Sequence, residues 1–247
     1  MASNLNPSFS SSSLSTQTNL YEFLSELVYK RIATINYLRR THEGTTHWFN
    51  TVLLSREDLT SMYPNNKMSG RTSKFFTLGV SLGPILDVTN QVDYVKALHL
   101  LLHEFECHNN DHQKPKMKNI FRKTRGKDDH SYVDDGEYTH LLTPNMPFEL
   151  DYIQTCFTLF DLLGEAYHKL LVGTESLCTQ AFCEQVLKCD AKLKKIVSMI
   201  TKELDTLARN AIKEELKLID PLSSLGKMSP IDIDWDNNNK MPPVDIS

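Results

Sequence analysis

The chain has 247 residues, of which 40% are hydrophobic and 23% charged, with a formal net charge of −4 at pH 7. These values are those of an ordinary globular protein, and the small acidic excess excludes one that holds nucleic acid or an anionic membrane through its overall charge. Its 9 glycines and 10 prolines are too few for the turns of a typical all-β fold.

The five cysteines are odd in number, and one of them, Cys156, falls in a strongly apolar stretch. Free buried thiols in a reducing compartment are the simplest interpretation. We therefore expect a cytoplasmic protein, with the nucleus as the alternative.

Residues 1–18 are rich in serine, threonine and asparagine, and we expect them to be disordered. The first helix is predicted to begin at Asn19, which can cap it while Glu22 occupies the capping-box position. Gly44 is a suitable residue for its end. Seven apolar residues at helical spacing form its buried face: Leu20, Leu24, Leu27, Val28, Ile32, Ile35 and Leu38.

Two short helices are expected next. Residues 48–54 form a compact apolar segment that we interpret as helical. Ser55 can cap the second helix, with Asp58 at its third position, and Pro64 ends it.

Two longer helices are predicted to follow. The first covers residues 75–86, and Pro84 should break or kink it because proline cannot donate the backbone hydrogen bond of a helix interior. The second is predicted to start at Asn90 or Asp93 and to run through Phe105.

Residues 113–136 have no apolar period, and we predict a long, exposed, charged loop. Its basic run comprises Lys114, Lys116, Lys118, Arg122, Lys123, Arg125 and Lys127, with Met117, Ile120 and Phe121 interspersed. A solvated loop is the simplest interpretation. The mixture also suits an anionic membrane surface, an acidic partner or, least of all, RNA. Aspartates directly after the run weaken the membrane interpretation.

Residues 148–172 carry apolar side chains on most sides of a predicted helix. A helix of this kind must be surrounded by other elements, so we expect it at the centre of the core. Asp151, Gln154 and Asp161 make it too polar to cross a membrane.

A long helical tract is predicted from about residue 174 to residue 219, with a possible break near Lys188. Its apolar residues form a heptad seam: Val186, Leu193, Val197, Ile200, Leu204, Leu207 and Ala211. A bundle helix that packs on residues 148–172 is the simpler interpretation, and a homodimeric coiled coil through residues 186–211 is the alternative. The sequence thus predicts an all-α bundle of six or seven helices in one domain, residues 19–220, followed by a disordered acidic tail.

Glutamate and histidine pairs raise the question of a metal. Glu165 and His168 fall at the spacing used by carboxylate-bridged di-metal bundles, and Glu137 and His140 repeat it. His108 and His112 lie one helical turn apart. Solvated side chains are the simpler interpretation of all of them, and we predict no cofactor.

The tail contains a motif-like segment that ends in Ile233, Asp234, Trp235 and Asp236. A tryptophan among acidic residues in a disordered tail has its large apolar surface free for a partner. The segment resembles the tryptophan-acidic peptides that cargo adaptors present to kinesin light chains. The alternative is that Trp235 folds back onto the bundle.

Residues 75–79 (FFTLG) and 142–149 (LTPNMPFE) resemble stretches of an uncharacterised group of fungal proteins. That resemblance implies a single intracellular helical domain and no activity. We therefore expect a non-catalytic adaptor or scaffold with protein partners. A peripheral membrane component that uses the basic loop, and a metal-dependent bundle enzyme, are the alternatives.

Overall fold

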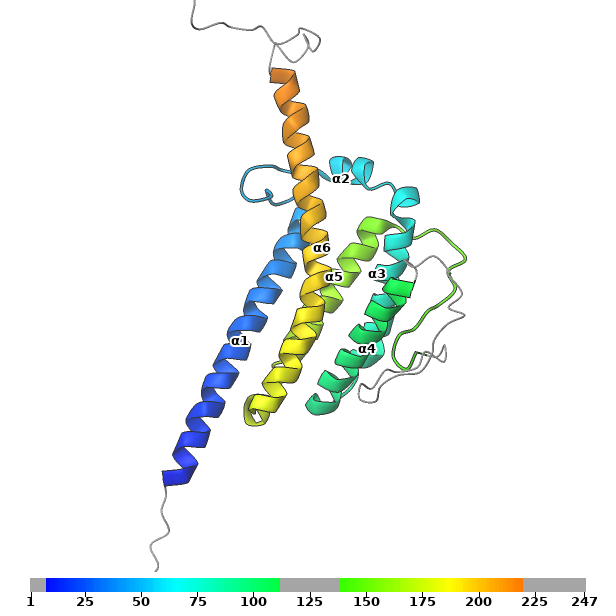
Figure 1. Ribbon diagram of the computed structural model, residues 1–247. Helices are drawn as coiled ribbons and strands as arrows, with labels where there is room; N and C mark the ends of the chain where they lie inside the picture. Colours follow the sequence, from blue (N-terminus) through cyan, green and yellow to red (C-terminus); the bar gives the residue numbers. More distant parts are fainter. Residues whose placement is uncertain (1–7, 112–137, 220–247) are drawn as a thin grey trace, which may run out of the picture.

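The computed structural model describes residues 8–111 and 138–219, which fold as a bundle of α-helices (Figure 1). The elements are α1 (Ser8–His42), α2 (Arg56–Met62), α3 (Asn65–Leu86), α4 (Gln91–Asp111), α5 (Tyr152–Lys169), the 3-10 turn η1 (Glu175–Leu177) and α6 (Gln180–Ile219). An isolated bridge between Trp48 and Val52 is the sole β feature of these ranges. The predicted all-α fold is confirmed.

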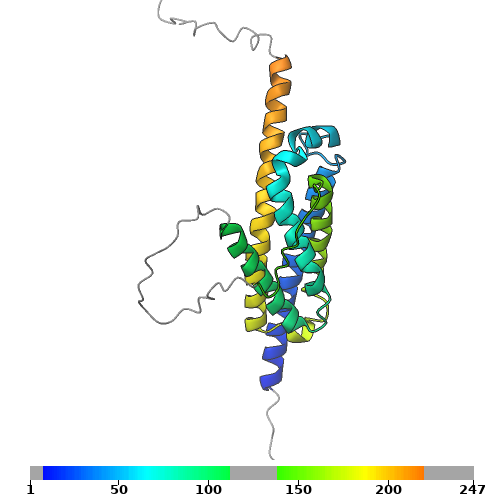
Figure 2. The ribbon, with the colours of Figure 1, turned by 90° about the vertical axis from the view of Figure 1, so that its right-hand side faces the viewer.

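Helices α3 and α5 run in one direction, and α1, α4 and α6 run in the other (Figures 1 and 2). At the starts of α3 and α5 the backbone N–H of Tyr152 donates to Asn65 Oδ1 at 3.0 Å. At their ends Lys169 donates to the carbonyl of Leu86. The C-terminal turns of α6 and the N-terminal turns of α1 project from opposite ends of the bundle.

Helix α1 begins at Ser8, so the predicted start and cap at Asn19 are wrong. Extending an existing helix costs far less than nucleating one, and serine is only moderately unfavourable inside it. The predicted end is confirmed, because the helix stops at His42 and Gly44 follows with φ +73°. A Cβ at Gly44 would lie 3.1 Å from the backbone nitrogen of Arg56, so the turn also needs a residue without a side chain.

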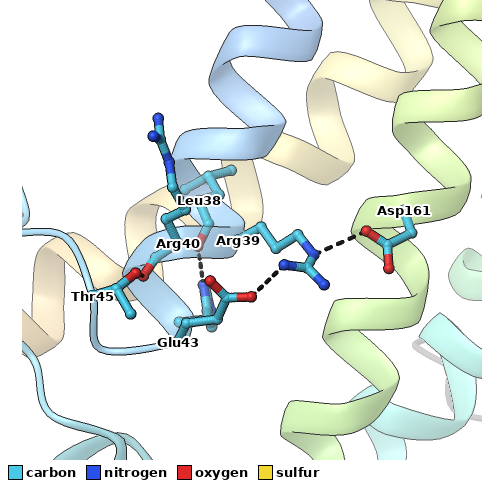
Figure 3. A network of polar contacts seen from close by, with 7 residues as sticks. Leu38, Arg39, Arg40, Glu43, Thr45 and Asp161 are labelled. Atoms are coloured by element: carbon cyan, nitrogen blue, oxygen red, sulfur yellow. Dashed lines mark hydrogen bonds and ion pairs between the residues drawn. The ribbon is translucent and has the colours of Figure 1, made fainter.

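The C-terminal end of α1 is joined to α5 by Arg39 (Figure 3). Its Nε donates to Asp161 Oδ1 at 2.9 Å, and the same guanidinium pairs with Glu43. The guanidinium also lies over the Phe157 ring, 5.6 Å from its centroid. Because the Asp161 side chain is largely exposed, this contact orients the two helices more than it stabilises them.

The expected helix at residues 48–54 is not formed. Phe49 and Asn50 have φ values of 47° and 55°, in the left-handed region that a right-handed helix cannot contain. Trp48 and Leu54 are buried all the same, at 3% and 1% exposure, and Trp48 stacks on Tyr37 with ring centroids 5.5 Å apart, whereas Phe49 and Leu53 are exposed. The apolar content of this segment therefore predicts burial only in part, and it does not predict a helix.

The predicted cap of α2 is confirmed, because Ser55 and Asp58 form a complete capping box. Helix α3 starts earlier than expected, at Asn65, and continues through Pro84, so the predicted break is wrong. Pro84 stands in the last turn, where a missing backbone donor removes one hydrogen bond near the helix end. Asn90 caps α4, since its Oδ1 accepts from the backbone N–H groups of the second and third residues that follow it.

Helix α5 is central, as predicted. It packs between α1 and α3 and is hydrogen-bonded to the other two long helices. Tyr94 of α4 donates to the carbonyl of Ala166 at 2.8 Å, and Tyr167 of α5 donates to Asp190 of α6 at 2.8 Å. A single exposed stripe remains: Gln154, Thr158, Asp161, Glu165 and His168.

Helix α6 is continuous, without the break considered near Lys188. Its predicted seam is buried, as Leu193, Ile200 and Leu204 with 0% exposure show, so α6 is a helix of the bundle. It packs mainly on α4 and α1, and not on residues 148–172 as expected. A homodimer through residues 186–211 would find most of that seam already covered. None of the described helices combines the length and apolar character that a bilayer span requires.

Candidate functional site

A groove of about 760 Å³ lies between α3, α4 and α6. We call it the basic groove. Its floor is apolar: Phe75 of α3, Leu102 and Phe105 of α4, and Ile196 of α6 are buried beneath it. Met68 and Met199 complete the apolar lining, and Met199 is 39% exposed. The methionines supply apolar surface that adapts to different ligand shapes.

Five basic side chains line the groove above this floor: Lys67, Arg71 and Lys74 of α3, and Lys192 and Lys195 of α6. Those of α3 recur at intervals of four and three residues, which places them on one face of the helix. The lysines of α6 are three residues apart, and both precede the apolar Ile196. Helical periodicity thus brings cations from two separate helices to the two sides of one depression.

One acidic residue, Glu106 of α4, lies among these cations. It pairs with Lys192 and, at 2.8 Å, with Lys195. Burial by itself would raise the pKa of the Glu106 carboxyl, but the hydrogen bonds from the two lysines outweigh it and hold that pKa below its usual value. Glu106 is therefore a carboxylate at neutral pH, and it fixes the α6 side of the groove.

The positive charge on the α3 side of the groove is less neutralised by carboxylates than that on the α6 side. Arg71 pairs with Glu203 of α6 across the groove. Lys67 and Lys74 have no ion-pair partner within residues 17–110 and 138–219. Five cations against one lining carboxylate leave the groove positive, and these two lysines are its unpaired charges.

Asn109 of α4 adds an unsatisfied polar atom to the groove. Its side-chain oxygen is buried and accepts no hydrogen bond from the described part of the chain. Leaving a buried polar atom unpaired costs about 1–3 kcal/mol. A ligand that donates a hydrogen bond at this position would recover that energy.

The positive surface continues over α6. An adjoining hollow of about 530 Å³ is lined by Lys194, Lys195 and Lys202, with Glu203 at the boundary with the basic groove. By contrast, a groove of about 360 Å³ between α3 and α5 is lined by apolar and uncharged polar side chains, with Asp151 as its sole charged lining residue. The two kinds of groove therefore suit different ligands, and only the first attracts anions.

The metal candidates are not brought together. Glu165 and His168 lie exposed on α5. His108 packs edge-on against the Tyr138 ring, with centroids 5.7 Å apart. His112 lies outside the described residues. Within the described ranges no three histidine, cysteine or acidic side chains gather as a metal site would require.

A buried ion pair marks a second polar cluster, at the contact of α1, α5 and α6. Arg31 donates to both carboxylate oxygens of Asp190, at 2.7 and 3.0 Å, and Tyr167 donates to the first of them. Asp190 is 6% exposed, so the cluster faces no groove. Its bonds are satisfied internally, and it joins three helices.

The thiols are also part of the packing. Cys156, Cys178, Cys183 and Cys189 are free and buried, as predicted, whereas Cys107 is exposed. Burial raises the pKa of Cys156 and Cys189 to about 12, which keeps both thiols protonated and unreactive at neutral pH.

The other contact elements predicted from the sequence, the basic loop at residues 113–136 and the tail with Trp235, lie outside the described residues. The residues of the basic groove were not predicted. The spacing of the basic residues at positions 67, 71 and 74 indicates that they share one face of a helix. It does not show that this face lines a groove, because that depends on which helices pack beside it.

No family model, curated protein or solved structure matches this chain, so its function has to be argued from the groove itself.

Proposed function

We propose that the protein is a non-catalytic helical adaptor that binds, in its basic groove, a short partner segment with both acidic and large apolar side chains. The pairing of an apolar floor with unpaired cations above it supports this proposal. Apolar side chains bound there would leave water, and carboxylates would reach Lys67 and Lys74.

The composition of the groove favours binding over catalysis. Among the described residues its lining contains no histidine, cysteine or serine, and the one carboxylate among them is held between two lysines. General acid–base or nucleophilic chemistry needs a group whose protonation or nucleophilicity is free to change. The charged groups here are arranged to hold an anion in place.

The test is direct binding of a defined peptide. A fluorescein-labelled peptide that alternates leucine with aspartate is titrated with the intact chain, and anisotropy is measured. We expect saturable binding that weakens at least about tenfold in Lys67→Glu/Lys74→Glu, because each reversed charge costs about 1 kcal/mol. The wild-type chain should bind a peptide with asparagine in place of aspartate no more tightly than the variant binds the aspartate peptide.

A matched control variant distinguishes the effect of the groove lysines on peptide binding from the effect of the net charge. Lys30→Glu/Lys96→Glu changes the net charge equally, at exposed lysines outside the groove. It should bind the peptide like the wild type. Equal losses in both variants, or binding to phosphatidylserine vesicles with none to the peptide, would contradict the proposal.

A further inference from the structure

The chemistry of the basic groove defines the segment that fits it. Phe75, Phe105 and Ile196 offer apolar contact, and Lys67 and Lys74 offer charges without a partner in the described ranges. The complementary segment places carboxylates and large apolar side chains close together along a short stretch of chain.

This chain carries such a segment itself. Residues 231–236 alternate Ile231, Ile233 and Trp235 with three aspartates. Bound in an extended form, the alternation would place the apolar side chains on one side and the carboxylates on the other. We infer that residues 231–236 occupy the basic groove of their own chain and compete with the partner segment, an inference that rests on the proposed function.

The length of the chain beyond α6 permits this contact. Helix α6 passes the groove at Lys192 and ends at Ile219, a rise of about 40 Å at about 1.5 Å per residue. An extended chain covers about 3.3 Å per residue, so Trp235 can reach about 50 Å from Ile219. The segment therefore spans the return distance along α6, and little chain is left over.

Attachment to the same molecule strengthens the contact. A segment of the same chain binds at an effective concentration that the linker sets and that does not fall when the protein is diluted. The occupancy of the groove by the tail is then independent of the protein concentration. A partner segment would bind fully only when its own affinity or its concentration overcomes the tail.

Trp235 makes the contact measurable in the full-length chain. The chain has two tryptophans, and the other, Trp48, is 3% exposed beside Tyr37. Incorporation of 5-fluorotryptophan gives two fluorine resonances, which Trp235→Phe assigns. We expect the Trp235 resonance of the wild type to differ from that of a free peptide of residues 229–238. In Lys67→Glu/Lys74→Glu it should move to the free-peptide position, whereas Trp48 stays in place.

The control Lys30→Glu/Lys96→Glu should leave both resonances where they are in the wild type. A wild-type Trp235 resonance at the free-peptide position would overturn the inference. So would a shifted resonance that is unaffected by Lys67→Glu/Lys74→Glu, because the tail would then contact another surface.

Competition distinguishes this inference from the proposed function. The leucine–aspartate peptide should bind Trp235→Ala about tenfold more tightly than the wild type, as expected when the tail occupies the groove about nine-tenths of the time. Equal, groove-dependent binding to both chains would overturn the tail contact and leave the adaptor function standing. Absence of binding to both would overturn the adaptor function.

Light scattering at increasing protein concentration tests whether the contact is made within one chain. We expect a monomer at all concentrations. A dimer that Trp235→Ala dissociates would overturn the assignment of the tail to its own groove.

Discussion

Replacement of Asp190 by asparagine should destabilise the bundle strongly, because this residue joins α1, α5 and α6. Asp190→Asn keeps the volume and one hydrogen-bond acceptor but removes the charge that faces Arg31 at 2.7 and 3.0 Å. Breaking a buried ion pair from one side costs about 3–5 kcal/mol. The hydrogen bond from Tyr167 is retained and Arg31 is partly exposed, and both reduce this cost. We therefore expect the free energy of unfolding to fall by about 2–4 kcal/mol.

Urea denaturation followed by circular dichroism measures this loss. For a fold of this size, 2–4 kcal/mol corresponds to a decrease in Tm of about 10 °C. The matched control is Glu26→Gln, which removes a carboxylate from an exposed pair with Lys30 of α1 and should leave the urea midpoint almost unchanged. Equal, small losses in both variants would refute the argument that Asp190 holds the three helices together.

The pH dependence provides an independent check. Burial alone would raise the pKa of the Asp190 carboxyl, but hydrogen bonds from Arg31 and Tyr167 outweigh it and hold the pKa below its usual value. The unfolded chain, with a pKa of about 3.9, therefore binds the proton first as pH falls. The stabilisation is complete above about pH 5 and is lost as pH falls through the folded pKa. The difference in stability between wild type and Asp190→Asn should narrow below pH 5, and a difference that widens would contradict this account.

Three further substitutions test the local structure by the same urea measurement. Gly44→Ala should cost about 2 kcal/mol, because φ is +73° and the new Cβ would lie 3.1 Å from the Arg56 nitrogen; no loss would show that the turn relaxes. Ser55→Ala should cost about 1 kcal/mol through loss of the α2 capping box, and an unchanged midpoint would mean that α2 needs no cap. Tyr94→Phe should cost about 1–2 kcal/mol, because the buried hydroxyl donates to Ala166 at 2.8 Å; a neutral result would remove this link between α4 and α5.

Predictions from residues close in sequence are confirmed where one local interaction decides the backbone conformation. The box of Ser55 and Asp58, the cap at Asn90 and the turn at Gly44 are each formed by residues close in sequence. They failed where a neighbouring element decides. The apolar content of residues 48–54 predicts a helix, yet Trp48 lies in a loop and is buried by stacking on Tyr37. Propensity also placed the start of α1 too late, because a helix already formed extends through serines.

The sequence by itself determined the all-α class, the central position of α5 and the buried seam of α6, because apolar residues at a helical period must leave water whatever the topology. It also made a contiguous basic run conspicuous. Only the tertiary structure decided where the basic groove lies. Lys67 and Lys74 are ordinary surface lysines until α3 packs beside α4 and α6, and Glu106 is an ordinary glutamate until Lys192 and Lys195 reach it. A site built from three helices has no local pattern, because the distances that create it are fixed by packing.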